Sequence, residues 1–359
     1  MKYTLLTLLT LAALGRAKAQ SNLFISFNDK HIYYEGRIGH PDTTACEFYW
    51  SGTSATINFQ GTGISAWLDD AGNSNFYTAV IDNRPQAKFH LTAGKRLYPL
   101  AANLSAGKHT VMLFKDTEWS FGKTKFYGFE LAGNVLTAPE APRRKIEFYG
   151  NSITCGYAIE DTVTKGNSPD AKFENNYLAY GSLTARHFNA AYTCTARSGI
   201  GVTVGWTPYT MPEIYDRLNP DDSTSKWNFS NYQPNIVVIN LGENDASMSS
   251  HPEQANFKAR FGTQKPGGAY FVRAYQRFFS TIRSKYPSAT IIAVLGDMSA
   301  VRPGSPWPGY ITQAVANLHD HKMLTHFFKP NKGQGHPLVN DDKEMADELI
   351  SFIDRHVQW

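Results

Sequence analysis

A change in hydrophobic pattern between residues 137 and 142 constrains the fold of this 359-residue chain more than any other feature. Before it, short runs of alternating apolar and polar residues are separated by turn-forming clusters such as Asp70-Ala71-Gly72-Asn73. After it, short β-branched runs alternate with amphipathic stretches of helical period. Because the two patterns belong to different architectures, we expect two domains joined by the Pro-containing stretch 137–142. A chain of this length can bury a core in each domain.

The first domain, residues 20–137, is predicted to be an all-β, jelly-roll-like sandwich. Short alternating runs at turn-separated intervals are typical of antiparallel sheets, and no helical period interrupts them. The predicted strands are Ser54 to Gln60, Gly63 to Leu68, Asn75 to Ile81, Lys88 to Leu91, His109 to Lys115 and Phe126 to Leu131.

The second domain, residues 144–359, is predicted to be a three-layer α/β/α sandwich with a parallel sheet. Its apolar runs are short and β-branched, as buried parallel strands tend to be. We expect strands at 146–149, 191–195, 236–241 and 290–295, and helices at 270–286 and 341–356. In such folds functional groups collect at the carboxyl ends of the strands.

The first nineteen residues match a secretory signal peptide. Lys2 is followed by an apolar run from Leu5 to Leu14 and by the small-residue site Ala17-Lys18-Ala19. We therefore expect cleavage of residues 1–19 and a secreted or periplasmic product. No later stretch approaches the roughly 20 apolar residues of a transmembrane helix, so no membrane span is expected.

The charge distribution bears on the kind of partner, and the cysteine content bears on disulfide bonding. The net charge of +4 arises from 35 basic and 31 acidic residues without long runs of one sign, which argues against a nucleic-acid partner. The chain has three cysteines, Cys46, Cys155 and Cys194. A Cys155–Cys194 disulfide and three buried free thiols both fit this count.

Four chemically useful residues follow predicted strands or precede the last helix, in the order Ser152, Gly199, Asn244, His336. A serine hydroxyl at a strand end, beside unpaired N–H groups of a helix start, is placed as a nucleophile would be. Glycine exposes its backbone N–H, an asparagine amide can donate to an oxyanion, and an imidazole can act as base. Taken singly, each also fits a cap, a turn or a loop.

The blocks Gly150-Asn151-Ser152, Gly242-Glu243-Asn244-Asp245 and Gly335-His336-Pro337 resemble those of the SGNH hydrolases. The β-sandwich, the segment 146–157 and the segment 211–217 together resemble carbohydrate esterase family two more narrowly. This resemblance implies a serine esterase that removes acetyl groups from plant polysaccharides such as xylan and glucomannan.

By the resemblance, Ser152 is the nucleophile and His336 its base. The N–H groups of Ser152 and Gly199 and the amide of Asn244 would form the oxyanion hole, with Gly201 as the alternative glycine. The chemistry implies no metal and no cofactor. Many SGNH enzymes carry an Asp shortly before the histidine, where this chain has glycine and glutamine.

We therefore expect a Ser-His dyad whose imidazole is oriented by a backbone carbonyl or by an acid from elsewhere in the chain. Asp341 and Asp342, which follow His336, are interpreted as residues of a helix start.

Three aromatic residues, Trp206, Tyr209 and Trp307, are candidates for stacking on sugar rings, with core or lid packing as the alternative. Two other functions remain open at this stage. One is an SGNH esterase acting on lipid or aryl esters, and the other is a non-catalytic carbohydrate-binding protein. The sequence leaves the oligomeric state open.

Overall fold

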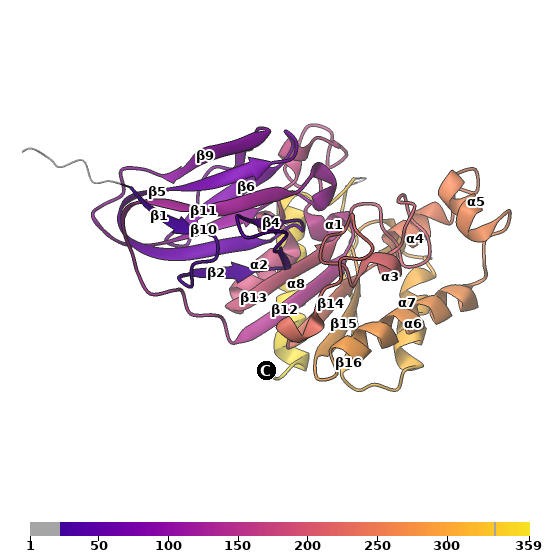
Figure 1. The fold of residues 1–359 in the computed structure, drawn as a ribbon. Coiled ribbons are helices and arrows are strands. Elements are labelled where there is room, and N and C mark those ends of the chain that lie inside the picture. The colour runs from indigo at the N-terminus through magenta and orange to yellow at the C-terminus, as the bar shows by residue number, and fades with distance from the viewer. Residues whose placement is uncertain (1–21, 334) are drawn as a thin grey trace, which may run out of the picture.

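The computed structural model describes residues 22–333 and 335–359, and it has an antiparallel β domain followed by a parallel α/β domain (Figure 1). This order confirms the predicted fold class. The predicted signal peptide, residues 1–19, lies outside the described residues.

The β domain is a curled, eleven-stranded antiparallel sheet in the described part of the chain. Its strands are β1 Leu23–Ser26, β2 Ile32–Glu35, β3 Ile38–Gly39, β4 Cys46–Phe48, β5 Ser54–Asp70, β6 Phe76–Ile81, β7 Arg84–Pro85, β8 Phe89–His90, β9 Gly94–Ala101, β10 Gly107–Lys115 and β11 Thr124–Val135. A short 3-10 helix, η1 Trp119–Phe121, connects β10 to β11. The long strand β5 organises the domain, since β2, β9, β10 and β11 all pair with it.

Strand β5 joins two runs that the sequence pattern separates. Gly61 and Gly63 remain paired with β11 through the intervening segment, where the ladder shifts register between Ala132 and Gly133. A Cβ atom on Gly61 would lie 2.2 Å from the Ala132 oxygen, so glycine permits this close approach of the two backbones. Two shorter strands would have required a turn that is not there.

Over residues 144–333 and 335–359, the α/β domain has a five-stranded parallel sheet in the order β13-β12-β14-β15-β16. The strands are β12 Arg144–Gly150, β13 Ala190–Ala196, β14 Ile236–Asn240, β15 Thr290–Leu295 and β16 Met323–Phe327. The edge strand β16 was not predicted, because only Met323 of its five residues is buried and the run carries Thr and His. From β12 the chain first forms β13 on one side of it and then β14 on the other side. Because the strand order reverses at this point, a crevice opens at the carboxyl ends of β12 and β14.

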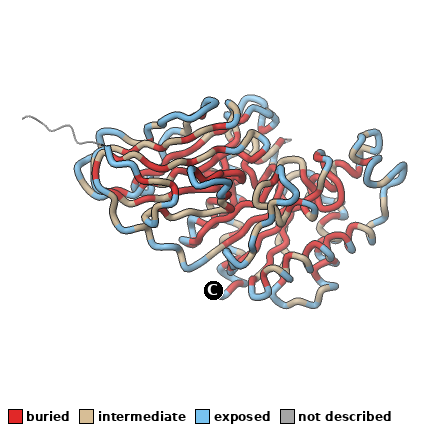
Figure 2. The backbone as a smooth tube through the Cα atoms, in the orientation of Figure 1, coloured by how far each residue is buried: buried red, intermediate tan, exposed pale blue. Residues whose placement is uncertain are grey.

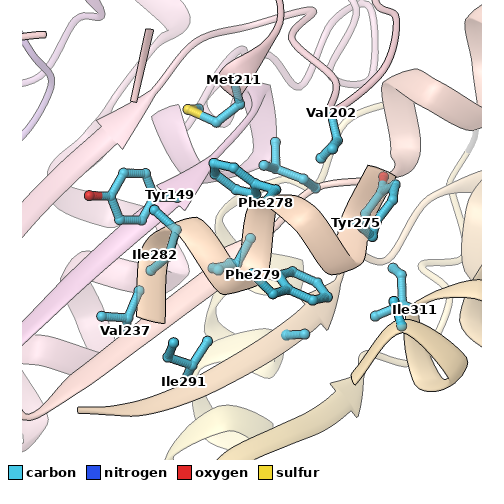
Figure 3. Packing of buried hydrophobic residues seen from close by; sticks show 14 of the residues in the cluster. Tyr149, Val202, Met211, Val237, Tyr275, Phe278, Phe279, Ile282, Ile291 and Ile311 are labelled. Carbon is cyan, nitrogen blue, oxygen red and sulfur yellow. The ribbon is translucent and has the colours of Figure 1, made fainter. Parts of the chain in front are cut away.

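Helices cover both faces of this sheet. The α-helices are α1 Ser152–Cys155, α2 Tyr180–His187, α3 Met211–Ile214, α4 Glu243–Met248, α5 Ala255–Phe261, α6 Gly268–Lys285, α7 Trp307–Ala316 and α8 Val339–His356, and the 3-10 helices are η2 Ala171–Phe173, η3 Asn176–Leu178, η4 Phe229–Asn231 and η5 Ser299–Val301. Alternate residues of the strands face α6 and α7 on one side, as Val237 and Ile291 do in Figure 3, and α2 and α8 on the other. The predicted three layers are present.

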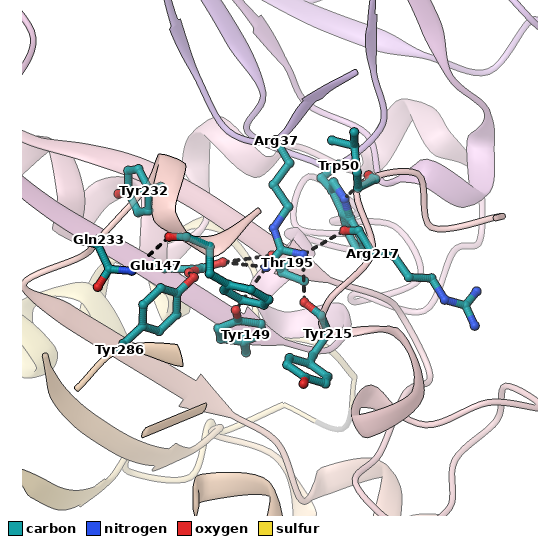
Figure 4. Close-up of polar contacts among 12 residues, drawn as sticks. Arg37, Trp50, Glu147, Tyr149, Thr195, Tyr215, Arg217, Tyr232, Gln233 and Tyr286 are labelled. Atoms are coloured by element: carbon teal, nitrogen blue, oxygen red, sulfur yellow. Dashed lines mark hydrogen bonds and ion pairs between the residues drawn. The ribbon is translucent and has the colours of Figure 1, made fainter. Parts of the chain in front are cut away.

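The two domains are joined by a buried polar network around Arg37, which follows β2 (Figure 4). Its guanidinium is fully buried and donates to Glu147 Oε1 at 2.9 Å and to the Tyr149 hydroxyl at 3.0 Å, both on β12. It also donates to the carbonyl oxygens of Tyr215 and Arg217.

Buried residues run along the strands of both sheets and exposed residues concentrate in the outer loops (Figure 2).

The three cysteines are buried free thiols, so the second of the two alternatives for them is the one observed. Burial raises the pKa of the Cys194 thiol to about 12. None of the helices in residues 22–333 and 335–359 combines the length and apolar character of a membrane span.

Candidate active site

A cavity of about 620 Å³ lies at the carboxyl ends of β12, β13 and β14, and Ser152, Gly199, Asn244 and His336 all line it. Ser152 is the first residue of α1, and the helix cap is its neighbour Asn151, whose side chain accepts from the Ile153 N–H at 3.1 Å. Ser152 is therefore free of the capping role that its residue type favours elsewhere. As the first helical residue, it presents an N–H without an acceptor one turn earlier.

His336 faces Ser152 from the loop before α8. Its Nε2 atom lies 2.8 Å from Ser152 Oγ, and its Nδ1 atom lies 3.0 Å from the carbonyl oxygen of Gly166. A carbonyl oxygen can only accept, so Nδ1 carries the proton and Nε2 is the free acceptor for the Ser152 hydroxyl. The imidazole is thus held in the tautomer of a general base by a backbone atom.

The loop that supplies the Gly166 carbonyl is organised by Asp161. The Asp161 carboxylate accepts hydrogen bonds from the Thr164 hydroxyl and from backbone N–H groups of Thr164, Asn167 and Ser168. Although partial desolvation opposes it, this set of donors lowers the pKa of Asp161 to about 2. The carboxylate is therefore ionised in neutral solution, and the loop around Gly166 closes on it.

Glycine is required where this loop meets the histidine. Gly166 has a φ of +77°, and a Cβ atom on it would lie 2.4 Å from the His336 carbonyl oxygen. Gly335 lies against the same loop, where a Cβ atom would approach the Lys165 oxygen to 2.0 Å. Both contacts are backbone against backbone, so a side chain at either position displaces the imidazole.

Two further donors face the cavity. The Asn244 Nδ2 atom donates one N–H to the Ile200 carbonyl oxygen at 2.9 Å, which sets the orientation of the amide and leaves its second N–H for the cavity. Gly199 has a φ of +80°, and its N–H has no acceptor in the part of the chain that the structure describes. Gly201 does not line the cavity, because its Cα faces the Val204 backbone and Asp245, so Gly199 is the glycine at the site.

Family models match both domains. The model for the Carbohydrate esterase 2 N-terminal domain matches residues 34–139, and the model for the GDSL-like Lipase/Acylhydrolase family matches residues 148–324. A solved family two carbohydrate esterase from Clostridium thermocellum, in complex with cellohexaose, is 33% identical and superposes with a TM-score of 0.80 over 90% of this chain and 98% of that one. The chain belongs to carbohydrate esterase family two.

Curated relatives agree with this family. The cellulase/esterase CelE of Acetivibrio thermocellus is 34% identical over 340 residues. The match covers 91% of this chain but only 40% of the length of CelE. An acetylxylan esterase / glucomannan deacetylase of Cellvibrio japonicus is 25% identical over 344 residues, covering 93% of this chain and 91% of the relative.

In this family two chain, the three predicted aromatic residues occupy different environments. Trp206 lines the cavity and is 46% exposed. Tyr209 packs against Trp119 of the β domain, with ring centroids 6.0 Å apart, and does not line the cavity. Trp307 begins α7 and is buried against Phe271, so core packing, the alternative to sugar stacking, is the one observed for Trp307. The helix over 307–316 was not recognised from the sequence, and it turns Trp307 into the core.

Sequence reasoning did not assign two residues that line the cavity, Tyr157 and Glu243. Tyr157 lines the cavity and lies against the His336 ring, with centroids 4.6 Å apart. Glu243 also lines it, and its carboxylate accepts from the Ser299 N–H at 3.0 Å and the Ala300 N–H at 2.9 Å. Glu243 therefore ties the η5 wall of the cavity to the start of α4, beside Asn244. An acid within a Gly-Glu-Asn-Asp turn was the available signal.

The electrostatics of His336 suit a base. Burial disfavours the charged imidazolium and lowers its pKa, while the hydrogen bond to Gly166 opposes this shift. In the described residues, no three His, Cys, Asp or Glu side chains are placed to share a metal ion. The arrangement can take a proton from Ser152 and donate hydrogen bonds to an oxyanion beside it.

Proposed function

We propose that this protein is a secreted serine esterase that removes O-acetyl groups from plant polysaccharides such as xylan and glucomannan. The observation that carries the proposal is the contact of His336 Nε2 with Ser152 Oγ at 2.8 Å, inside a cavity that also presents Gly199 and Asn244. Secretion rests on the sequence of residues 1–19.

The proposed reaction has two steps. Ser152 Oγ attacks the acetyl carbonyl carbon as His336 Nε2 takes its proton, and the sugar oxygen leaves with that proton as the ester C–O bond breaks. Water then attacks the acetyl-serine, His336 removes a proton from the water, and acetate leaves as Ser152 is re-protonated. The N–H groups of Ser152 and Gly199 and the Asn244 amide stabilise the oxyanion in both steps.

The cavity supports a carbohydrate ester rather than a long-chain lipid ester. Apart from Trp206, Met298 and Tyr157, its walls are polar or glycine residues, including Arg197, Ser247 and Asn331. The exposed ring of Trp206 is suited to stacking on a sugar face at the rim. Two relatives from Cellvibrio japonicus, each an acetylxylan esterase / glucomannan deacetylase, agree with this class of substrate.

The test compares the mature protein with its Ser152→Ala variant for acetate release from acetylated xylan, acetylated glucomannan and para-nitrophenyl acetate. We expect release by the mature protein and a loss of roughly a thousandfold or more in the variant. A preference for para-nitrophenyl esters of long fatty acids would favour a lipid esterase. A folded protein that binds these glycans and releases no acetate would be a binding protein instead.

A further inference from the structure

Glu118, a glutamate of the β domain, contacts the segment that leads into Gly199. Glu118 precedes η1, is 2% exposed, and reaches the segment that follows β13. Its Oε1 atom accepts from Arg197 Nη1 at 3.0 Å, and its Oε2 atom accepts from the Ser198 N–H at 2.8 Å. One carboxylate therefore holds the two residues that immediately precede Gly199.

Arg197 passes this restraint to the next peptide. The same Nη1 atom donates to the Ser198 carbonyl oxygen at 2.9 Å. In a planar trans peptide, the carbonyl and the N–H of the following residue point in opposite directions. Since Arg197 holds the Ser198 carbonyl on its side, the Gly199 N–H points away from Arg197, and it has no acceptor within the described residues.

The alternative orientation would be damaging. Gly199 has a positive φ of +80°, a region that glycine enters and leaves at little cost, so rotation of the Ser198–Gly199 peptide is not blocked by a side chain. A rotated peptide would turn a carbonyl oxygen, instead of an N–H, toward the developing oxyanion. Some restraint from outside this peptide is needed to hold the donor in place.

We propose that Glu118 is a positioning residue that, through Arg197, keeps the Ser198–Gly199 peptide in the orientation that donates to the oxyanion. The β domain thereby completes the catalytic site of the α/β domain. This inference rests on the esterase function proposed above, and it adds a role for the first domain in that reaction.

Glu118 is itself held at the domain boundary. Its backbone N–H donates to Glu174 Oε1 at 2.5 Å, and Glu174 belongs to the α/β domain. The next residue, Trp119, packs its ring against the Arg197 guanidinium, at 5.3 Å from the centroid, and against Trp50. These contacts couple the position of Glu118 to the docking of the two domains.

The test is Glu118→Gln in the full-length mature protein. A glutamine has one acceptor oxygen for two donors and turns its own NH₂ group toward one of them, so the contact with Arg197 or with Ser198 is lost. We expect kcat for para-nitrophenyl acetate to fall about ten- to hundredfold, less than the loss of a whole donor, with KM changed less than about threefold. Glu118→Asp, which keeps the charge but shortens the side chain, should be intermediate.

Two further variants separate positioning from general stability. Glu147→Gln also alters a buried carboxylate at the domain boundary, and Glu35→Gln alters the carboxylate that accepts from the Tyr192 N–H across that boundary. Both residues are outside the cavity, and both variants should keep wild-type kcat. The double variant Glu118→Gln/Arg197→Met should lose no more kcat than Arg197→Met alone, because Glu118 is proposed to act through Arg197.

A folded Glu118→Gln protein with kcat within twofold of wild type would overturn the inference, as would an equal fall in kcat for Glu147→Gln and Glu35→Gln. If Glu118→Gln does not fold, Glu118→Asp decides in the same way. The rate at which an arylsulfonyl fluoride modifies Ser152 provides a readout without an acetyl substrate. An inactive wild type whose sulfonylation still slows in Glu118→Gln would refute the proposed acetyl esterase and retain the role of Glu118.

Discussion

The Nδ1 atom of His336 lies 3.0 Å from the carbonyl oxygen of Gly166, a residue 170 positions earlier in the chain. This backbone oxygen occupies the place of the carboxylate that orients histidine in a Ser-His-Asp triad. A carbonyl selects the Nδ1–H tautomer as a carboxylate does, but without a full negative charge to stabilise the imidazolium. The consequence is that loop geometry, rather than the chemistry of one side chain, holds the base in place.

Replacing Gly166 by alanine should impair catalysis. The new Cβ atom would lie 2.4 Å from the His336 oxygen, and the φ of +77° adds strain. We expect kcat to fall about ten- to hundredfold through displacement of the imidazole. Gly94→Ala is the matched control, because Gly94 has a φ of +89° with no atom within 4 Å of the added Cβ. Equal kcat values for the two variants would contradict this account of Gly166.

Asp161→Asn should loosen the loop that carries Gly166. A neutral amide cannot accept the same set of hydrogen bonds, so we expect kcat to fall about tenfold as the imidazole loses its fixed partner. The control is Asp170→Asn, because the Asp170 carboxylate caps η2 through the Lys172 N–H and is exposed. Unchanged turnover by Asp161→Asn would show that the loop does not depend on this carboxylate.

The acidic midpoint of the pH profile of kcat/KM should lie below 6.5, the ordinary pKa of histidine. His336 must be neutral to act as base, and burial lowers its pKa from 6.5, so the neutral form persists as the pH falls below that value. A profile of kcat/KM against pH reports the free enzyme, and we expect its acidic midpoint below 6.5. A midpoint above 6.5 would mean that the charged imidazolium is favoured at this site.

Arg37→Met should destabilise the whole protein. Removal of Arg37 leaves Glu147 as a buried charge without its ion-pair partner, which typically costs about 3–5 kcal/mol. Denaturant unfolding measures the difference. Arg260→Met is the control, because its ion pair with Glu213 is solvent-exposed and such pairs contribute at most about 1 kcal/mol. Similar losses from both variants would refute a special role for the buried pair.

The residues that meet at the cavity were predictable because parallel strands bring their carboxyl ends to one edge. Ser152 lies two residues after β12 and Asn244 lies four residues after β14, so topology brings them together once these strands are recognised. His336 required the family resemblance as well, since no strand immediately precedes it. The sequence did not decide between sugar stacking and core packing for Trp307, because amphipathic period did not reveal that α7 begins at that residue.

The supporting contacts were not predictable, for physical reasons. Any residue can offer a backbone carbonyl, so no side chain identifies Gly166 as the partner of His336. Glu118 lies 80 residues before Ser198 in a different domain, and only the docking of the two domains brings them together. The two β runs around Gly61 looked separate because the glycine interrupts the alternating pattern, whereas the backbone ladder continues.

The most direct test of the account is detection of the acetyl-enzyme. The mature protein is mixed with para-nitrophenyl acetate, quenched in acid within the first turnover, digested, and analysed by mass spectrometry. We predict an acetyl group on Ser152 in the wild type and none on the corresponding peptide of Ser152→Ala. Hydrolysis that continues in Ser152→Ala, with no acetyl adduct on Ser152 in the wild type, would contradict the central claim that Ser152 is the nucleophile.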